Sequence, residues 1–183
     1  VISGKGEMPL YERDKYPWVK KANKITSVVI GEGITKINRY SFSNYSYKKN
    51  YSNKKRYQIS SVTLPSTLIS IADYAFTSTH IKTLKIPNRV EHIGFCAFKW
   101  CRITTLELPL SVKRIYDEAF YHNNITNIIN FPYGIQHIGA SAFARNNITN
   151  LTLPSSLTEI SREAFCDNNI FNVTIPPSVT KIG

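Results

Sequence analysis

Residues 148–169 read ITNLTLPSSLTEISREAFCDNN, and the same pattern recurs before and after this stretch. Two markers give its period, a leading isoleucine and a phenylalanine that follows an alanine. The isoleucines lie 22, 22, 22, 23 and 22 residues apart, at Ile59, Ile81, Ile103, Ile125, Ile148 and Ile170. The phenylalanines keep this spacing at Phe76, Phe98, Phe120, Phe143 and Phe165. Repetition with a period of about 20–50 residues predicts a solenoid, in which successive repeats stack on one another.

The repeat at residues 81–102 shows which side chains such a stack buries. Polar and apolar residues alternate from Thr83 to Ile86, which predicts a short half-buried strand. Pro87 cannot donate a hydrogen bond to a sheet, so we expect the strand to end there. A second apolar pair and an Ala-Phe turn follow, and the predicted core is Ile81, Leu84, Ile86, Val90, Ile93, Ala97 and Phe98. Each repeat needs neighbours on both sides, because only they cover these side chains.

One polar position recurs in the turn that leads into each strand. It holds Thr79, Cys101, Asn123, Asn146 and Asn168 in successive repeats. Asparagine bonds local backbone well in a tight turn, and threonine or cysteine does so more weakly. We therefore expect a structural column of side chains along the stack, which also accounts for Cys101.

The repeat pattern divides the chain into two parts. Residues 1–24 lack the repeat, and we expect them to form an N-terminal cap that covers the first turn, with Trp18 and Val19 in contact with it. Residues 25–183 hold about seven repeats, of which the first and last are incomplete. The sequence stops before the final Ala-Phe turn, so Ile175, Val179 and Ile182 should face either water, more repeats or another subunit.

Positive charge is concentrated in the first third of the chain. The net charge is +11, but residues 1–57 hold 13 Lys and Arg against 4 Asp and Glu, whereas residues 58–183 hold 10 against 8. Part of the excess lies in a twelve-residue insertion within residues 44–57. Its candidate binding residues are Tyr45, Tyr47, Lys48, Lys49, Tyr51, Lys54, Lys55, Arg56 and Tyr57. Insertions in repeat proteins often form the binding face, although the same composition also suits a solvated loop.

The pattern IxxLxLPxxVxxIxxxAFxx(N/C) resembles the leucine-rich repeats of the bacterial BspA-like group, and particularly their treponemal subclass. The resemblance covers residues 25–183, without the insertion. It implies a right-handed superhelix with a concave parallel β-sheet and with short turns or helical segments on the convex side. It also implies a role in adhesion or protein binding at or outside the cell envelope, that is periplasmic, on the cell surface or secreted. Val1 is not an initiator methionine, and no signal peptide is visible in the sequence.

The outward strand positions form a second candidate surface. They are small, polar and nearly neutral, and the binding candidates among them are Thr63, Thr83, Lys85, Thr105, Glu107 and Thr152. A plain sheet surface is the alternative. Residues 125–147 carry one extra residue, which predicts a β-bulge at residues 128–131 and makes Ile129 a further candidate.

The sequence predicts no enzyme, no cofactor and no metal site. The repeats offer no pair of carboxylates and no activated nucleophile. His92 and His137 occupy one repeat position with Arg114 between them, so they should lie ~10 Å apart, too far to share a zinc ion. Cys96, Cys101 and Cys166 are expected to be packed thiols, although a disulfide between the first two is conceivable.

We therefore expect a non-enzymatic binding scaffold. Its partner would be a protein, such as a host or extracellular-matrix protein, held by the concave face. The alternative is a polyanion, such as a glycosaminoglycan or nucleic acid, bound by the basic insertion. No apolar run approaches the roughly 18–20 residues of a membrane span.

Overall fold

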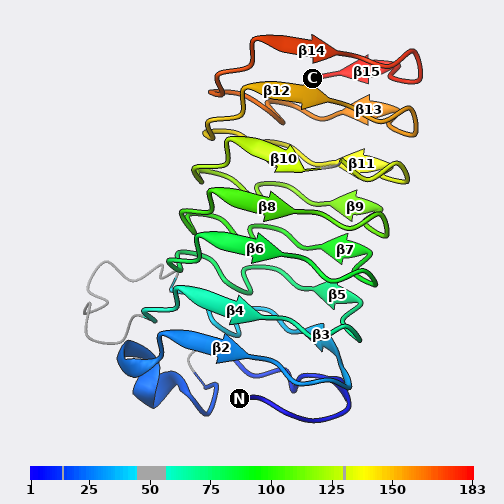
Figure 1. The fold of residues 1–183 in the computed structure, drawn as a ribbon. Helices are drawn as coiled ribbons and strands as arrows, with labels where there is room; N and C mark the ends of the chain where they lie inside the picture. Colours follow the sequence, from blue (N-terminus) through cyan, green and yellow to red (C-terminus); the bar gives the residue numbers. More distant parts are fainter. Residues whose placement is uncertain (14, 45–56, 130) are drawn as a thin grey trace.

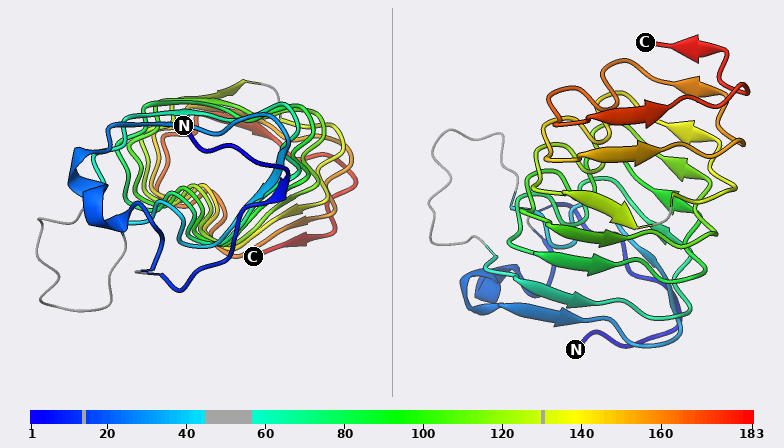
Figure 2. Two further views of the ribbon diagram at one scale, coloured as in Figure 1. Left: turned by 90° about the horizontal axis from the view of Figure 1, so that it is seen from below. Right: turned by 45° about the horizontal axis from the view of Figure 1, so that its top comes forward.

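The computed structural model describes residues 1–13, 15–44, 57–129 and 131–183. The chain winds into a stack of turns, and each full turn contributes two short strands to two parallel rows (Figure 1). Viewed along the stack, successive turns superpose around a common interior (Figure 2). The predicted solenoid with parallel strands is confirmed.

The first row holds the strands predicted from the alternating pattern. Its middle residues, such as Leu84 and Leu106, are buried, and its flanking residues point outward. The row is divided into three sheets, β2-β4, β6-β8-β10 and β12-β14. The strands are β2 (Ser27–Val29), β4 (Ser61–Thr63), β6 (Thr83–Lys85), β8 (Thr105–Glu107), β10 (Asn127–Ile129), β12 (Asn150–Thr152) and β14 (Asn172–Thr174).

The second row is a continuous eight-stranded sheet, where the sequence predicted turns or helical segments. Each strand from β3 to β13 in this row carries a buried isoleucine, such as Ile93 or Ile115, which gives these turns a strand-like pattern. The register aligns His92, Arg114 and His137, as predicted. The strands are β1 (Gly6–Glu7), β3 (Ile34–Ile37), β5 (Ser70–Ile71), β7 (His92–Ile93), β9 (Arg114–Ile115), β11 (His137–Ile138), β13 (Glu159–Ile160) and β15 (Lys181–Ile182).

The phenylalanines of the Ala-Phe turns form one stack of rings through the core. Neighbouring centroids lie 5.1–5.6 Å apart, with interplanar angles of 3–16°. Phe76, Phe98, Phe120 and Phe143 are fully buried within it. Such offset rings add packing energy beyond their buried area, so the stack ties each turn to the next.

Residues 1–24 cover the first turn in two ways. Trp18 stacks on Phe42 with centroids 5.4 Å apart and donates its indole N–H to the carbonyl oxygen of Ser41 at 2.8 Å. Val19 packs against the same core, at the start of η1 (Val19–Lys24), the only helix in the described residues. Strand β1 pairs with β3, so this segment also extends the second row.

The predicted polar column is present. The side chain of Asn146 accepts a hydrogen bond from the backbone N–H of Ile125 at 3.0 Å and donates to the carbonyls of Phe120 and Phe143. Asn123 and Asn168 repeat this arrangement. The thiol of Cys101 lies 3.0 Å from the carbonyl oxygen of Phe76, so cysteine makes the same type of bond more weakly.

Two further observations complete the fold. Of the three apolar side chains predicted to lack cover in the last turn, Ile175 and Ile182 are exposed, at 44% and 60%, whereas Val179 packs partly against the core. No helix in the described part of the chain has the length and apolar character needed to cross a membrane.

Candidate binding site

The outward positions of the first row form a face of short polar side chains. Thr83 lies directly beside Thr105, and Lys85 beside Glu107, because β6 and β8 pair in register. The ammonium of Lys85 and the carboxylate of Glu107 form an ion pair at 3.1 Å. Their charges are therefore balanced, and the face is neutral there. The other predicted strand candidates, Thr63 and Thr152, are also exposed on it.

The first row is interrupted between β10 and β12. Strand β10 pairs with β8 in unbroken register through Ile129, its last residue. Among the described residues, no ladder connects β10 to β12, which pairs with β14 instead. The interruption follows directly on the repeat with one extra residue. The predicted bulge does not occur within the β8–β10 ladder, and Asn130, where it would fall, lies outside the described residues.

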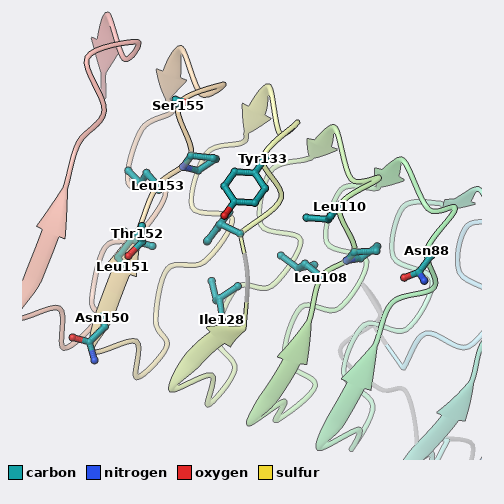
Figure 3. A pocket seen from close by; sticks show the side chains of 13 residues that line it. Asn88, Leu108, Leu110, Ile128, Tyr133, Asn150, Leu151, Thr152, Leu153 and Ser155 are labelled. Carbon is teal, nitrogen blue, oxygen red and sulfur yellow. The ribbon is translucent and has the colours of Figure 1, made fainter.

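A groove of about 790 Å³ opens at this interruption (Figure 3). Two exposed apolar side chains stand on its wall, Leu110 at 64% and Tyr133 at 77% exposure. Each directly follows the proline that ends its strand region, and the same position in the flanking repeats holds Asn88 and Ser155. Among the described residues that line the groove, none is charged. The floor and rim are formed by Leu108, Pro109, Ile128, Phe131, Asn150, Leu151, Thr152, Leu153 and Pro154.

Sequence reasoning missed Leu110 and Tyr133. A signal for them exists, because they are the apolar members of a column that otherwise reads Ser66, Asn88, Ser155 and Pro177. Of the predicted site residues, only Thr152 lines this groove, and Ile129 lies at the end of β10 beside it.

The candidates in the basic insertion divide into two groups. Tyr45, Tyr47, Lys48, Lys49, Tyr51, Lys54, Lys55 and Arg56 lie outside the described residues. Tyr57 lies in the core rather than on a binding loop. It is 3% exposed, and its ring packs edge-on against Phe42 at 6.3 Å. Its backbone N–H donates to the side-chain oxygen of Asn44, whose amide donates back to the Tyr57 carbonyl, so these two residues anchor the insertion.

The cysteines are unpaired, so no disulfide joins Cys96 and Cys101. Burial raises the pKa of each of these two thiols to about 12. They are therefore protonated at neutral pH and unreactive as nucleophiles, since the thiolate is the reactive form. Cys166 is exposed. Within the described residues, His, Cys, Asp and Glu form no group of three or more that could hold a metal ion.

The sequence matches the family model described as "BspA type Leucine rich repeat region". The match consists of six copies within residues 19–94 and 49–170. A comparison with curated proteins finds no match.

Several solved structures share the fold. A leucine-rich repeat protein from Bacteroides ovatus aligns over 98% of this chain and 60% of its own, with 20% identity and a TM-score of 0.59. The pneumococcal vaccine antigen PcpA aligns over 94% of this chain and 44% of its own, with 21% identity and a TM-score of 0.67. A leucine-rich repeat protein from Eubacterium ventriosum aligns over 99% and 56%, with 21% identity and a TM-score of 0.50. The chain thus spans less than two thirds of each of these structures.

Proposed function

Because the chain belongs to the BspA-type leucine-rich-repeat family, we propose that it is a non-enzymatic scaffold that binds a protein partner. A repeat stack suits this role, since it presents side chains from many turns on one extended surface. The paired charges of the strand face and the unreactive buried thiols offer no catalytic group there.

The main support for this proposal is the groove between β10 and β12. Exposed aromatic and aliphatic side chains beside a pocket are typical anchors of protein interfaces. Leu110 and Tyr133 stand side by side on neighbouring turns, and the polar strand face next to them would supply the rim. A partner that inserts an apolar side chain into this groove would remove both from water.

We further propose that the partner is a host or extracellular-matrix protein and that the chain works outside the cytoplasm as an adhesin. The support is the family and the fold shared with a pneumococcal vaccine antigen. The uncharged lining of the groove, with Leu110 and Tyr133 exposed on it, supports a contact with an uncharged and partly apolar surface.

Binding of purified collagen, laminin and fibronectin to the immobilised chain tests this function. We expect one of them to bind, and the double variant Leu110→Ser with Tyr133→Ser to weaken that binding at least tenfold. Loss of two anchors of this size costs more than about 1.4 kcal/mol at a typical interface. The double variant should fold normally, because both side chains are mostly exposed.

The matched control replaces two exposed apolar side chains far from the groove, Leu10→Ser and Ile69→Ser. This control should bind as the parent chain does. Equal binding by parent and groove variant would exclude the groove, and absence of binding to every matrix protein would exclude the proposed adhesin role.

The alternative is a polyanion binder that uses residues 45–56, and the charge of the first third favours it. A deletion that tests it must spare Asn44 and Tyr57, since the latter is a core residue. Replacing residues 45–56 with a short Gly-Ser linker should leave the thermal midpoint unchanged. Weaker heparin binding by that variant would support the alternative, and unchanged binding would exclude the insertion.

A further inference from the structure

A second charged surface lies entirely within the described residues, at the edge where the strands of the first row begin. Figure 1 shows the starts of β2, β4, β6 and β8 along this edge, with the helix η1 beside β2. Five exposed cations belong to it: Lys20, Lys21, Lys24, Lys82 and Arg102. We call this set the basic edge.

Backbone hydrogen bonds bring these residues together from distant parts of the sequence. The N–H of Gln58 donates to the carbonyl of Ile25, and the N–H of Thr104 donates to the carbonyl of Lys82. Residues 24–26, 58–60, 80–82 and 102–104 therefore stack on consecutive turns. With ~4.8 Å between neighbouring strands, Lys24 and Arg102 lie ~14 Å apart along the stack.

The basic edge contains no compensating acid. None of its five cations forms an ion pair with a residue that the structure describes. The segments that build it, residues 18–29, 57–63, 79–85 and 101–106, contain no Asp or Glu. Glu107 lies just beyond the edge and is already paired with Lys85. By contrast, Lys36, Lys113 and Lys181 on the second row each face a glutamate.

The positive charge of the basic edge affects a neighbouring histidine, His80. Burial and the charge of Arg102 both lower the pKa of His80, whose backbone N–H donates to the carbonyl of Ile59. His80 is therefore neutral at pH 7, and the cationic set consists of lysines and arginine.

We propose that the basic edge binds a linear sulfated polysaccharide. A row of unpaired cations along the stack matches a chain that carries regularly spaced sulfates, and neutralising such charges releases counterions. Single-stranded nucleic acid would also need aromatic rings for its bases. The two aromatic rings in the segments that build the edge, Trp18 and Tyr57, pack on Phe42. Trp100 and Tyr121 each hold the ammonium of Lys99 at 4.6 Å, so a cation already covers each of these rings. This site is separate from the groove and includes none of residues 45–56.

A charge-neutralising variant tests the proposal with size-fractionated heparin oligosaccharide as the probe. The edge variant combines Lys24→Gln, Lys82→Gln and Arg102→Gln, one change on each of three turns. The control variant combines Lys5→Gln, Arg89→Gln and Arg114→Gln, which are exposed cations elsewhere with the same total change in charge. Both variants keep residues 45–56, and equal thermal midpoints would establish that both are folded.

We expect the edge variant to bind heparin at least tenfold more weakly at about 100 mM salt, and the control variant less than threefold. The logarithm of the binding constant should depend less steeply on the logarithm of the salt concentration in the edge variant. The magnitude of this slope should fall by about 2, since each lost contact between a cation and a sulfate removes roughly 0.7–0.9. In the parent chain, heparin should slow amide hydrogen exchange at residues 24–26, 80–84 and 102–105. Equal weakening of both variants would mean that net charge alone is responsible, and would overturn the proposal. So would unchanged binding, or tighter binding of a single-stranded oligonucleotide of equal charge.

Discussion

Gly139 is a residue at which the close stacking of turns excludes a side chain. A Cβ atom there would lie 2.5 Å from the backbone nitrogen of Asp117 and 2.7 Å from the carbonyl carbon of Tyr116. Both are backbone atoms of the preceding turn, so the clash cannot be relieved by a rotamer change. The N–H of Gly139 also donates to the carbonyl of Ile115 at 2.8 Å, which fixes its position.

We therefore expect Gly139→Ala to lower the free energy of unfolding by about 1–3 kcal/mol, as overpacking does in other cores. Gly134→Ala is the matched control, because the nearest atom to its Cβ would lie at an ordinary 3.8 Å. Urea denaturation followed by circular dichroism measures both. Equal stability of the two variants would contradict the packing argument.

At the scale of elements, the interruption between β10 and β12 is the point where the 22-residue period fails. Deleting Asn130 returns that repeat to 22 residues. We expect the deletion to let β10 pair with β12, because β6, β8 and β10 pair with one another at a spacing of 22 residues, as do β12 and β14. The row is also divided between β4 and β6, where the spacing is 22 residues, so that division has another cause. Each new ladder bond would contribute about 0.5–1.5 kcal/mol, and the groove would narrow.

Hydrogen exchange measures this outcome at the amides of β12. Their exchange should slow in the deletion variant, and binding of a protein partner through Leu110 and Tyr133 should weaken. Unchanged exchange in β12 would show that the extra residue is not the cause of the interruption.

The elements also show what the sequence could and could not predict. Buried residues such as Ile93 and Phe98 were predictable, because the apolar period alone fixes which side chains face the core. Tyr57 was misassigned, since counting shows that twelve residues are inserted between Phe42 and Ile59 but not which ones remain in the core. Leu110 and Tyr133 were overlooked, because a turn accepts many residue types and a groove depends on where the ladder breaks in space.

At the scale of the whole molecule, ion pairs across neighbouring turns tie the second row together. The carboxylates of Glu91 and Glu159 accept hydrogen bonds from Lys113 and Lys181, and these bonds, with the lysine charges, lower the pKa of both carboxyls below the ordinary 4.5. Donation from Ser66 has the same effect on the pKa of Glu32.

A carboxyl group with a lowered pKa in the folded state stabilises the fold above its ordinary pKa. That contribution is lost as the pH falls through the lowered value. We therefore expect these carboxyls to make the thermal midpoint fall between about pH 4.5 and 3. The variant Glu91→Gln with Glu159→Gln should show a shallower fall in the same melting series. An identical fall would assign the acid sensitivity to other groups.

The asparagine column has a consequence for how the chain is made. The turn at residues 98–103 is completed by Asn123, and the turn at residues 120–125 by Asn146, each from 20 to 26 residues further along. During translation, the backbone N–H and C=O groups of one turn therefore lack these hydrogen-bond partners until the next repeat has been synthesised. We expect the turns to fold one after another from the N-terminal cap, each after the repeat that supplies its asparagine has emerged.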